Sequence, residues 1–273
     1  MIFMEIGIST ASFFSKETTE ASFEILHRLD IPVCEIFLST FSEYADDFID
    51  LILQVKGDIR IHSVHTLNQQ YEPELFNPTE RTRKDCEKIY KHVGYDAHRL
   101  GASYYTFHGP AKFKKLPYTH DYEKIGKRVQ ELCVLLDEAS KGTTKLTYEN
   151  VHWTFFNTPE YFENLKKYTD VFTCLDIKQA FLSGFDIYDY VECMGDRLKT
   201  LHICDYDENG RLVMPGKGIF DFTKLFSVLI GNGFDGAGLI EVYSNNYDSY
   251  DELAKSYDYL NECLYKAKNN GGI

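Results

Sequence analysis

The feature of this chain that most limits its fold is a regular alternation of strand-like and helix-like segments from one end to the other. Eight such pairs can be counted, with strands expected near residues 4–10, 33–38, 59–65, 103–108, 144–149, 171–176, 198–203 and 237–243. Strands that alternate with helices usually pair in parallel, because each helical crossover returns the chain to the same edge of the sheet. The alternation therefore predicts an α/β fold, a (β/α)8 TIM barrel.

Two of the expected helices can be examined by their apolar period. Apolar residues recur every three or four positions in both, at Phe222, Leu225, Phe226 and Leu229 and again at Leu253, Tyr257, Leu260 and Leu264. Such a stripe indicates a helix that packs one face against a sheet.

Length and composition indicate one large domain. A chain of 273 residues is of ordinary size for a single barrel, and because no low-complexity linker divides it we expect one domain over residues 1–273. Apolar residues make up 44% and charged residues 26%, which is typical of a soluble globular protein, and no apolar run approaches the roughly 20 residues of a membrane span. The opening MIFMEIGIST lacks the basic and long apolar regions of a signal peptide. We expect a first strand there, no membrane partner and a cytoplasmic location.

Charge and cysteine content exclude other classes of protein. The formal net charge of −13 gives a surface that repels a phosphate backbone, so we expect no nucleic-acid partner. The seven cysteines are scattered and form no CxxC pair. Their number and spacing favour reduced core thiols over a disulfide framework or a zinc cluster.

Four of the strand-like runs carry an acidic or imidazole side chain at or near their carboxyl ends. They are KLTYEN with Glu149, VFTCLD with Asp176, LKTLHICD with His202 and GAGLIEVY with Glu241. A strand, a helix and their loops take about 30 residues, so successive units deliver these side chains to one face of a barrel. Three carboxylates and one imidazole suit a single divalent ion such as Mn²⁺, Zn²⁺ or Co²⁺. Any one of the four, taken alone, is equally consistent with a buried polar residue satisfied by a neighbour.

With these motifs, the chain resembles the xylose isomerase-like barrel superfamily, which includes sugar 3-epimerases, inosose dehydratases, hydroxypyruvate isomerases and type IV apurinic endonucleases. The resemblance spans the chain and extends to the run Pro215, Gly216, Lys217, Gly218, followed by Asp221 and Phe222. It implies that one divalent metal ion is bound by Glu149, Asp176, His202 and Glu241. It also implies that Glu149 and Glu241 are catalytic and move a proton of a small ketose, keto-sugar or polyol through a metal-bound enediolate.

Further residues fall where the family has pocket or metal contacts. His65 ends the third strand and His108 the fourth; in the endonucleases these positions bind additional metal ions, and in the sugar enzymes they line the pocket. Trp153, just after Glu149, either stacks on a sugar ring or closes the barrel mouth. Glu35 lies on the second strand, where family members often carry an acid, and a charge inside a barrel needs a partner. We therefore expect a structural pairing for Glu35.

The chain departs from the family pattern at two positions. Gln179 stands three residues after Asp176, where most relatives have a histidine, and an amide is a poor metal ligand that cannot transfer a proton. Leu212 stands where the endonucleases have another histidine. These changes weigh against a trinuclear zinc phosphodiesterase. Gln179 can still bind a substrate hydroxyl, Lys178 can reach a substrate oxygen or a carboxylate, and Arg211 either binds a substrate anion or is solvated.

The leading hypothesis from the sequence is a metal-dependent sugar isomerase or epimerase with a small-molecule partner. The alternatives are a dehydratase that uses the same metal site, an endonuclease-like phosphodiesterase, and a barrel without turnover. A homo-oligomer is compatible with all four.

Overall fold

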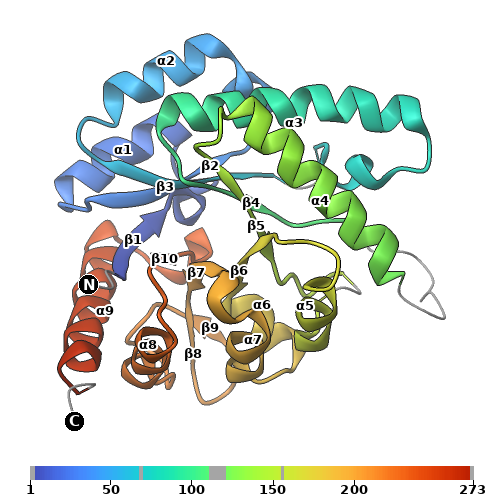
Figure 1. Cartoon of the computed structure of the whole chain (residues 1–273). Helices are drawn as coiled ribbons and strands as arrows, with labels where there is room; N and C mark the ends of the chain where they lie inside the picture. The colour runs from blue at the N-terminus through green and yellow to red at the C-terminus, as the bar shows by residue number, and fades with distance from the viewer. Residues whose placement is uncertain (1–3, 68–69, 111–120, 155–156, 271–273) are drawn as a thin grey trace.

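Eight parallel strands close into a barrel, as the sequence predicts (Figure 1). The computed structural model describes residues 4–67, 70–110, 121–154 and 157–270. Around the barrel the strands follow the order β1-β10-β7-β6-β5-β4-β3-β2, and β2 pairs with β1 to complete the ring. Their bounds are β1 (Glu5–Ser9), β2 (Val33–Leu38), β3 (Arg60–Thr66), β4 (Tyr104–Phe107), β5 (Lys145–Glu149), β6 (Phe172–Asp176), β7 (Leu198–Ile203) and β10 (Ala237–Ile240).

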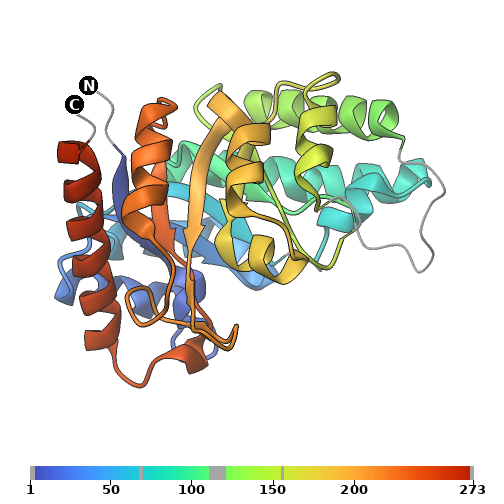
Figure 2. The same ribbon diagram turned by 90° about the horizontal axis from the view of Figure 1, so that it is seen from below.

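Helices surround the strands on the outside of the barrel (Figures 1 and 2). They are α1 (Thr19–Arg28), α2 (Asp46–Val55), α3 (Glu80–Leu100), α4 (Tyr122–Ala139), α5 (Pro159–Leu165), α6 (Ile177–Ser183), α7 (Ile187–Met194), α8 (Phe222–Gly231) and α9 (Tyr250–Asn270). Short 3-10 helices lie at Thr10–Phe13, Phe41–Tyr44, Glu72–Phe76, Gly195–Arg197 and Ser244–Asn246. The last helix, α9, packs beside α8 and β1, so the last helix and the first strand of the chain are neighbours.

The periodic helices bury the faces that their sequences predict. In α8 the whole stripe of Phe222, Leu225, Phe226 and Leu229 is buried, and in α9 so are Leu253, Leu260 and Leu264. Tyr257 is partly buried against the same core. The apolar sides of these helices therefore form the layer between helices and barrel.

The chain between β6 and β7 contains two helices where the sequence pattern suggested one. Gly184 ends α6 in the left-handed conformation, with φ of 76°, which favours a residue without a Cβ. Asp186 then starts α7, because its side chain accepts a hydrogen bond from the backbone N–H of Tyr188. A second addition is a short antiparallel hairpin of β8 (Asp205–Tyr206) and β9 (Leu212–Val213) in the loop after β7.

The strand register brings the carboxyl ends of the later strands to one level. Asp176 on β6 pairs with His202 on β7, and Glu149 on β5 pairs with Cys174, two residues before Asp176. Glu241 lies one residue beyond β10, and its N–H still donates to the carbonyl of Ile203 at 2.9 Å. Side chains at these ends are thus fixed by backbone hydrogen bonds.

The buried carboxylate of Asp205 stabilises the loop after β7 by accepting hydrogen bonds from its backbone. One carboxylate oxygen accepts from the N–H groups of Gly216 and Gly218, each at 3.1 Å, and the other accepts from Tyr206 at 2.8 Å and Phe220 at 3.1 Å. A Cβ at Gly218 would lie 2.2 Å from the Asp205 carboxylate, so only glycine allows this approach. The Pro-Gly-x-Gly motif is therefore the part of the loop that wraps around an acidic side chain.

Two expectations about the chain as a whole can be compared with the structure. All seven cysteines are free, and Cys34, Cys174, Cys204 and Cys263 are buried, as core thiols should be. Within the described ranges, none of the helices has both the length and the apolar content needed to cross a membrane.

We predict that Asp205→Ala lowers the free energy of unfolding by about 2–4 kcal/mol, because four loop N–H groups lose a charged acceptor. Urea denaturation followed by circular dichroism measures the change. Glu208→Ala, which removes an exposed acidic side chain from the same loop, should cost less than about 1 kcal/mol. Equal losses in the two variants would show that Asp205 does not hold the loop.

Candidate metal centre

The four side chains singled out by their strand-end positions meet at the carboxyl end of the barrel. Measured from Nδ1 of His202, the nearest carboxylate oxygens lie at 3.0 Å on Glu241, 3.6 Å on Glu149 and 3.9 Å on Asp176. All four residues are buried. One imidazole nitrogen therefore faces three carboxylates contributed by three other strand ends.

The donor atoms at this point suit a divalent cation. Nδ1 of His202 and one oxygen each of Glu149, Asp176 and Glu241 have no hydrogen-bond partner anywhere in the described part of the chain. Buried polar atoms are normally satisfied, so a group of this kind is a suitable place for a cation or a water molecule. Ligands at about 2.0–2.2 Å from one ion lie roughly 3–3.5 Å apart, close to the spacings above. The residues present therefore fit the metal that the sequence predicts.

The four candidate ligands Glu149, Asp176, His202 and Glu241, called the quartet below, are not equally close to one another. Donor atoms of Glu149, Asp176 and His202 all lie within 4.8 Å of one another, whereas Glu241 groups in this way with His202, Glu35 and His65. His202 belongs to both groups. It is accordingly the ligand that links Glu241 to the other two carboxylates.

Carboxylates and imidazoles crowd together at this centre, and their pKa values shift as a result. Burial raises the pKa of Asp176 to about 7, against the lowering effect of the Lys178 ammonium. Burial disfavours the charged form of His65 as well, but the carboxylates of Glu35, Glu149 and Glu241 together outweigh it and raise the pKa of His65 to about 9. A bound cation would relieve the crowding of carboxylates by replacing these protons.

A second group of donors lies beside the quartet. Nε2 of His65 and Nε2 of His108 are 2.8 Å apart, and they lie 3.8 Å and 3.4 Å from the same oxygen of Glu149. Their Nδ1 atoms contact the carboxylates of Glu35 at 3.2 Å and Glu72 at 2.8 Å. An imidazole that binds a metal commonly donates its other N–H to a carboxylate in this way. His65 and His108 can thus either line the pocket or, with Glu149, hold another ion.

The carboxylates of Glu35 and Glu72 orient the rings of His65 and His108 through contacts with their Nδ1 atoms. Glu35 has the structural pairing expected from the sequence, since it accepts hydrogen bonds from side chains of several strands. Glu72 is wholly buried and accepts from Thr66 at 2.9 Å, Tyr105 at 2.7 Å and both the backbone and ring nitrogens of His108. The sequence did not reveal Glu72, because a single acid in a long loop carries no periodic signal.

A pocket of about 340 Å³ opens above the centre. Asp176 and His202 are buried and are not among the residues that line it. The residues proposed from the sequence that line it are His65, His108, Glu149, Trp153, Lys178, Gln179 and Glu241. Phe14 and Phe37 add apolar rings, and the Trp153 ring lies 6.0 Å from that of His108. The volume suits a small ligand held between aromatic walls and a polar floor.

Three residues proposed for substrate contact have different surroundings. Oε1 of Gln179 accepts from the backbone N–H of His152 at 3.1 Å and also contacts its ring. Lys178 is buried with its ammonium against Glu241 and Asp176. Arg211 is exposed, pairs with Asp207 and does not line the pocket. The structure brings the first two to the mouth and leaves Arg211 outside it.

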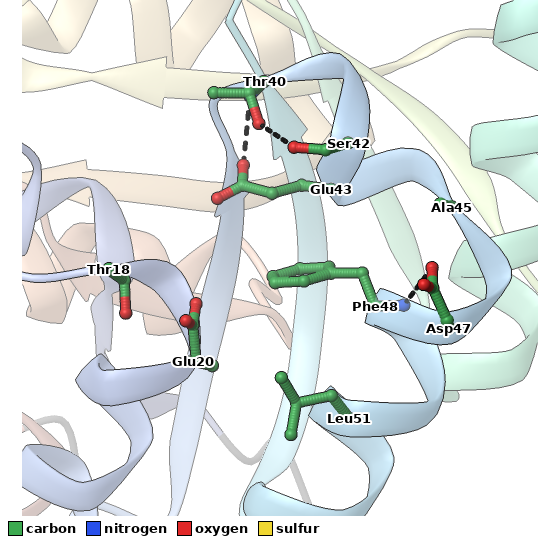
Figure 3. A pocket seen from close by; sticks show the side chains of 9 residues that line it. All are labelled: Thr18, Glu20, Thr40, Ser42, Glu43, Ala45, Asp47, Phe48 and Leu51. Carbon is green, nitrogen blue, oxygen red and sulfur yellow. Dashed lines mark hydrogen bonds between the residues drawn. The ribbon is translucent and has the colours of Figure 1, made fainter.

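A larger cavity, of about 540 Å³, lies elsewhere, between the start of α1 and the start of α2 (Figure 3). Its most buried acid, Glu43, is already satisfied by the hydroxyl of Thr19 at 2.8 Å and the N–H of Thr40 at 3.0 Å. None of the unpartnered buried atoms found among the described residues lies there. Chemistry, and not size, therefore identifies the barrel mouth as the candidate site.

Known proteins resemble this chain in sequence and in fold. An inosose dehydratase of Clostridium perfringens is 24% identical over 177 residues, which are 65% of this chain. The chain matches only 54% of that relative's length. The structure of a D-tagatose 3-epimerase-like protein superposes with a TM-score of 0.77 at 18% identity, covering 98% of this chain and 99% of that one. D-psicose 3-epimerase from Clostridium cellulolyticum H10, solved with D-tagatose, has a TM-score of 0.78 at 17% identity, covering 96% and 99%.

These structural likenesses establish the fold, and the sequence comparison establishes the family. The family model described as the xylose isomerase-like TIM barrel matches residues 23–263. That span contains the whole quartet and both histidines of the second donor group. The chain belongs to the xylose isomerase-like TIM-barrel family.

Proposed function

We propose that this chain is a divalent-metal-dependent isomerase or epimerase of a small ketose, keto-sugar or related polyol. The observation that carries the proposal is the pair of glutamates at the pocket floor, Glu149 and Glu241. Each has one carboxylate oxygen without a hydrogen-bond partner among the described residues, and each has an oxygen near Nδ1 of His202, at 3.6 Å for Glu149 and 3.0 Å for Glu241. Two strands, β6 and β7, separate their strands around the barrel. The glutamates therefore approach a pocket ligand from different sides.

The metal would be held by Glu149, Asp176, His202 and Glu241, and would supply Lewis-acid polarisation of a substrate carbonyl. A carboxylate of the pair removes the proton from the carbon next to that carbonyl, and the C–H electron pair passes into an enediolate. Return of a proton to the neighbouring carbon gives the isomer, whereas return to the same carbon from the opposite face gives the epimer. The buried imidazoles stay fixed during this transfer because Glu35 and Glu72 hold their Nδ1 atoms.

The pocket walls support a sugar-like ligand. Trp153 and Phe14 offer apolar faces on which the C–H face of a sugar ring can stack, and Gln179 lies on the rim with its amide held by His152. These contacts also exclude water from the centre, which strengthens the electrostatic effects of the glutamates.

A dehydratase is the second candidate, because a curated relative that covers much of the chain is an inosose dehydratase. The same proton abstraction would then be followed by loss of hydroxide from the next carbon. Mass spectrometry of the product separates the two reactions: an isomer retains the substrate mass, and a dehydration product is lighter by one water.

We predict that adding Mn²⁺ to chelator-treated protein raises the unfolding midpoint by roughly 5 °C or more, because the ion binds only the folded quartet. Asp176→Asn should abolish most of this increase, as seen by differential scanning calorimetry. The control Asp170→Asn alters an exposed acid just before β6 and should keep it. An increase of the same size in Asp176→Asn would place the ion elsewhere.

Metal content tests the number of ions. We expect about one tightly held ion per chain in the wild type and in His108→Gln, since the quartet does not include His108. Plasma emission analysis after desalting measures it. Two ions in the wild type and one in His108→Gln would instead assign an ion to the second donor group.

We predict that Glu149→Gln and Glu241→Gln each lower kcat by about 10³-fold on whichever ketose is turned over, because the amide cannot accept a proton. Loaded protein is incubated with D-tagatose, D-psicose, D-fructose or L-ribulose in D₂O, and NMR follows deuterium entry next to the carbonyl. Glu163→Gln, which alters an exposed acid on α5, should behave as the wild type. Full activity in both pocket variants would refute the proposal.

A further inference from the structure

Lys178 is a buried cation at the barrel mouth, and the proposed reaction gives it no role. It lies in the first turn of α6 and is only 5% exposed. Its ammonium lies 3.1 Å from Oε1 of Glu241 and 3.5 Å from Oδ2 of Asp176, and 4.9 Å from the centre of the Tyr243 ring. A full positive charge is therefore buried against two of the four candidate metal ligands.

The ammonium and a divalent ion would share these carboxylates. Oδ2 of Asp176 has no hydrogen-bond partner among the residues that the structure describes, and it is also the Asp176 oxygen that faces Nδ1 of His202. If Lys178 stays in place when the ion binds, the two cations repel each other at close range in a poorly solvated site. If Lys178 moves away, its ion pairs must be broken. Both courses weaken metal binding.

Lys178 is not needed to hold the ligands in position. The other oxygen of Asp176 accepts from the N–H of Gln179 at 3.0 Å, and the Asp176 backbone is clamped by Asn150 through bonds of 2.7 Å and 3.0 Å. Glu241 is fixed by its backbone bond to Ile203. The repulsive effect of the ammonium should therefore exceed any loss of ligand order when it is removed.

We propose that Lys178 is a positioning residue. Its ammonium compensates the negative charge of the carboxylates in the quartet before the ion binds, and thereby weakens the affinity for the ion. The three carboxylates of Glu149, Asp176 and Glu241 carry three negative charges. Counted with these three carboxylates alone, Lys178 and a divalent ion together balance the charge, whereas without Lys178 one negative charge of a loaded centre stays unbalanced. The inference rests on the proposed function only in taking the quartet as the metal site.

The test compares Lys178→Met with the wild type after chelator treatment. Mn²⁺ affinity is measured by electron paramagnetic resonance of the free ion, and unfolding midpoints are measured with and without Mn²⁺. Lys178→Met should bind Mn²⁺ at least about tenfold more tightly, and its metal-free form should unfold at a lower temperature than the wild type. Lys178→Arg keeps the charge and should stay near the wild-type affinity.

Lys199→Met is the matched control, because Lys199 forms an ion pair with Asp235 far from the centre, at the other end of the strands, and its loss should leave Mn²⁺ affinity unchanged. If the wild type binds Mn²⁺ and Lys178→Met binds it no more tightly, the inference fails while the proposed metal site stands. If neither protein binds Mn²⁺, both fail. Should metal-free Lys178→Met unfold during preparation, the same titration of Lys178→Gln decides.

Discussion

The candidate centre depends on one buried carboxylate, that of Glu35. It is wholly buried on β2, and it is reached by side chains of four other strands: Ser9 at 2.9 Å, Ser63 at 2.7 Å, Thr106 at 2.8 Å, Nδ1 of His65 at 3.2 Å and Nε2 of His202 at 3.1 Å. A buried charge is tolerated only when it is surrounded by donors in this way. The result is a polar layer within the barrel that fixes the ring planes of the imidazoles above it.

The barrel and the quartet were predictable because both depend on local patterns. Strand and helix periods follow from short stretches of sequence, and parallel strands present their carboxyl ends at one face, so residues such as Glu149 and Asp176 had to converge. Glu72 was not predictable, since it reaches His108 from a 3-10 helix in an irregular loop. The direction of the Lys178 side chain and the pairing of Arg211 with Asp207 could not be predicted either. Both depend on tertiary packing, which a periodic sequence pattern does not reveal.

The two carboxylate oxygens of Asp176 have different roles, one in starting a helix and one in the candidate metal centre. One accepts from Gln179 N–H and starts α6, and the other faces His202. Because the helix must begin at this residue, the side chains that follow in its first turn are delivered to the pocket rim. Gln179, at a position where the family resemblance leads us to expect a histidine, and Lys178 thus alter the surroundings of the centre without altering its strand-borne ligands.

The loop after β7 closes on itself around Asp205, which gathers N–H groups from both of its ends. Two side chains from outside the loop also hold it, because Ser256 donates to the carbonyl of Pro215 and Asn246 donates to that of Leu212, each at 2.9 Å. Such a segment can be exchanged between barrels only together with its acid, its glycines and these outside donors. Substrate range in such a scaffold can diversify by swapping rim segments while the strand-end ligands stay the same.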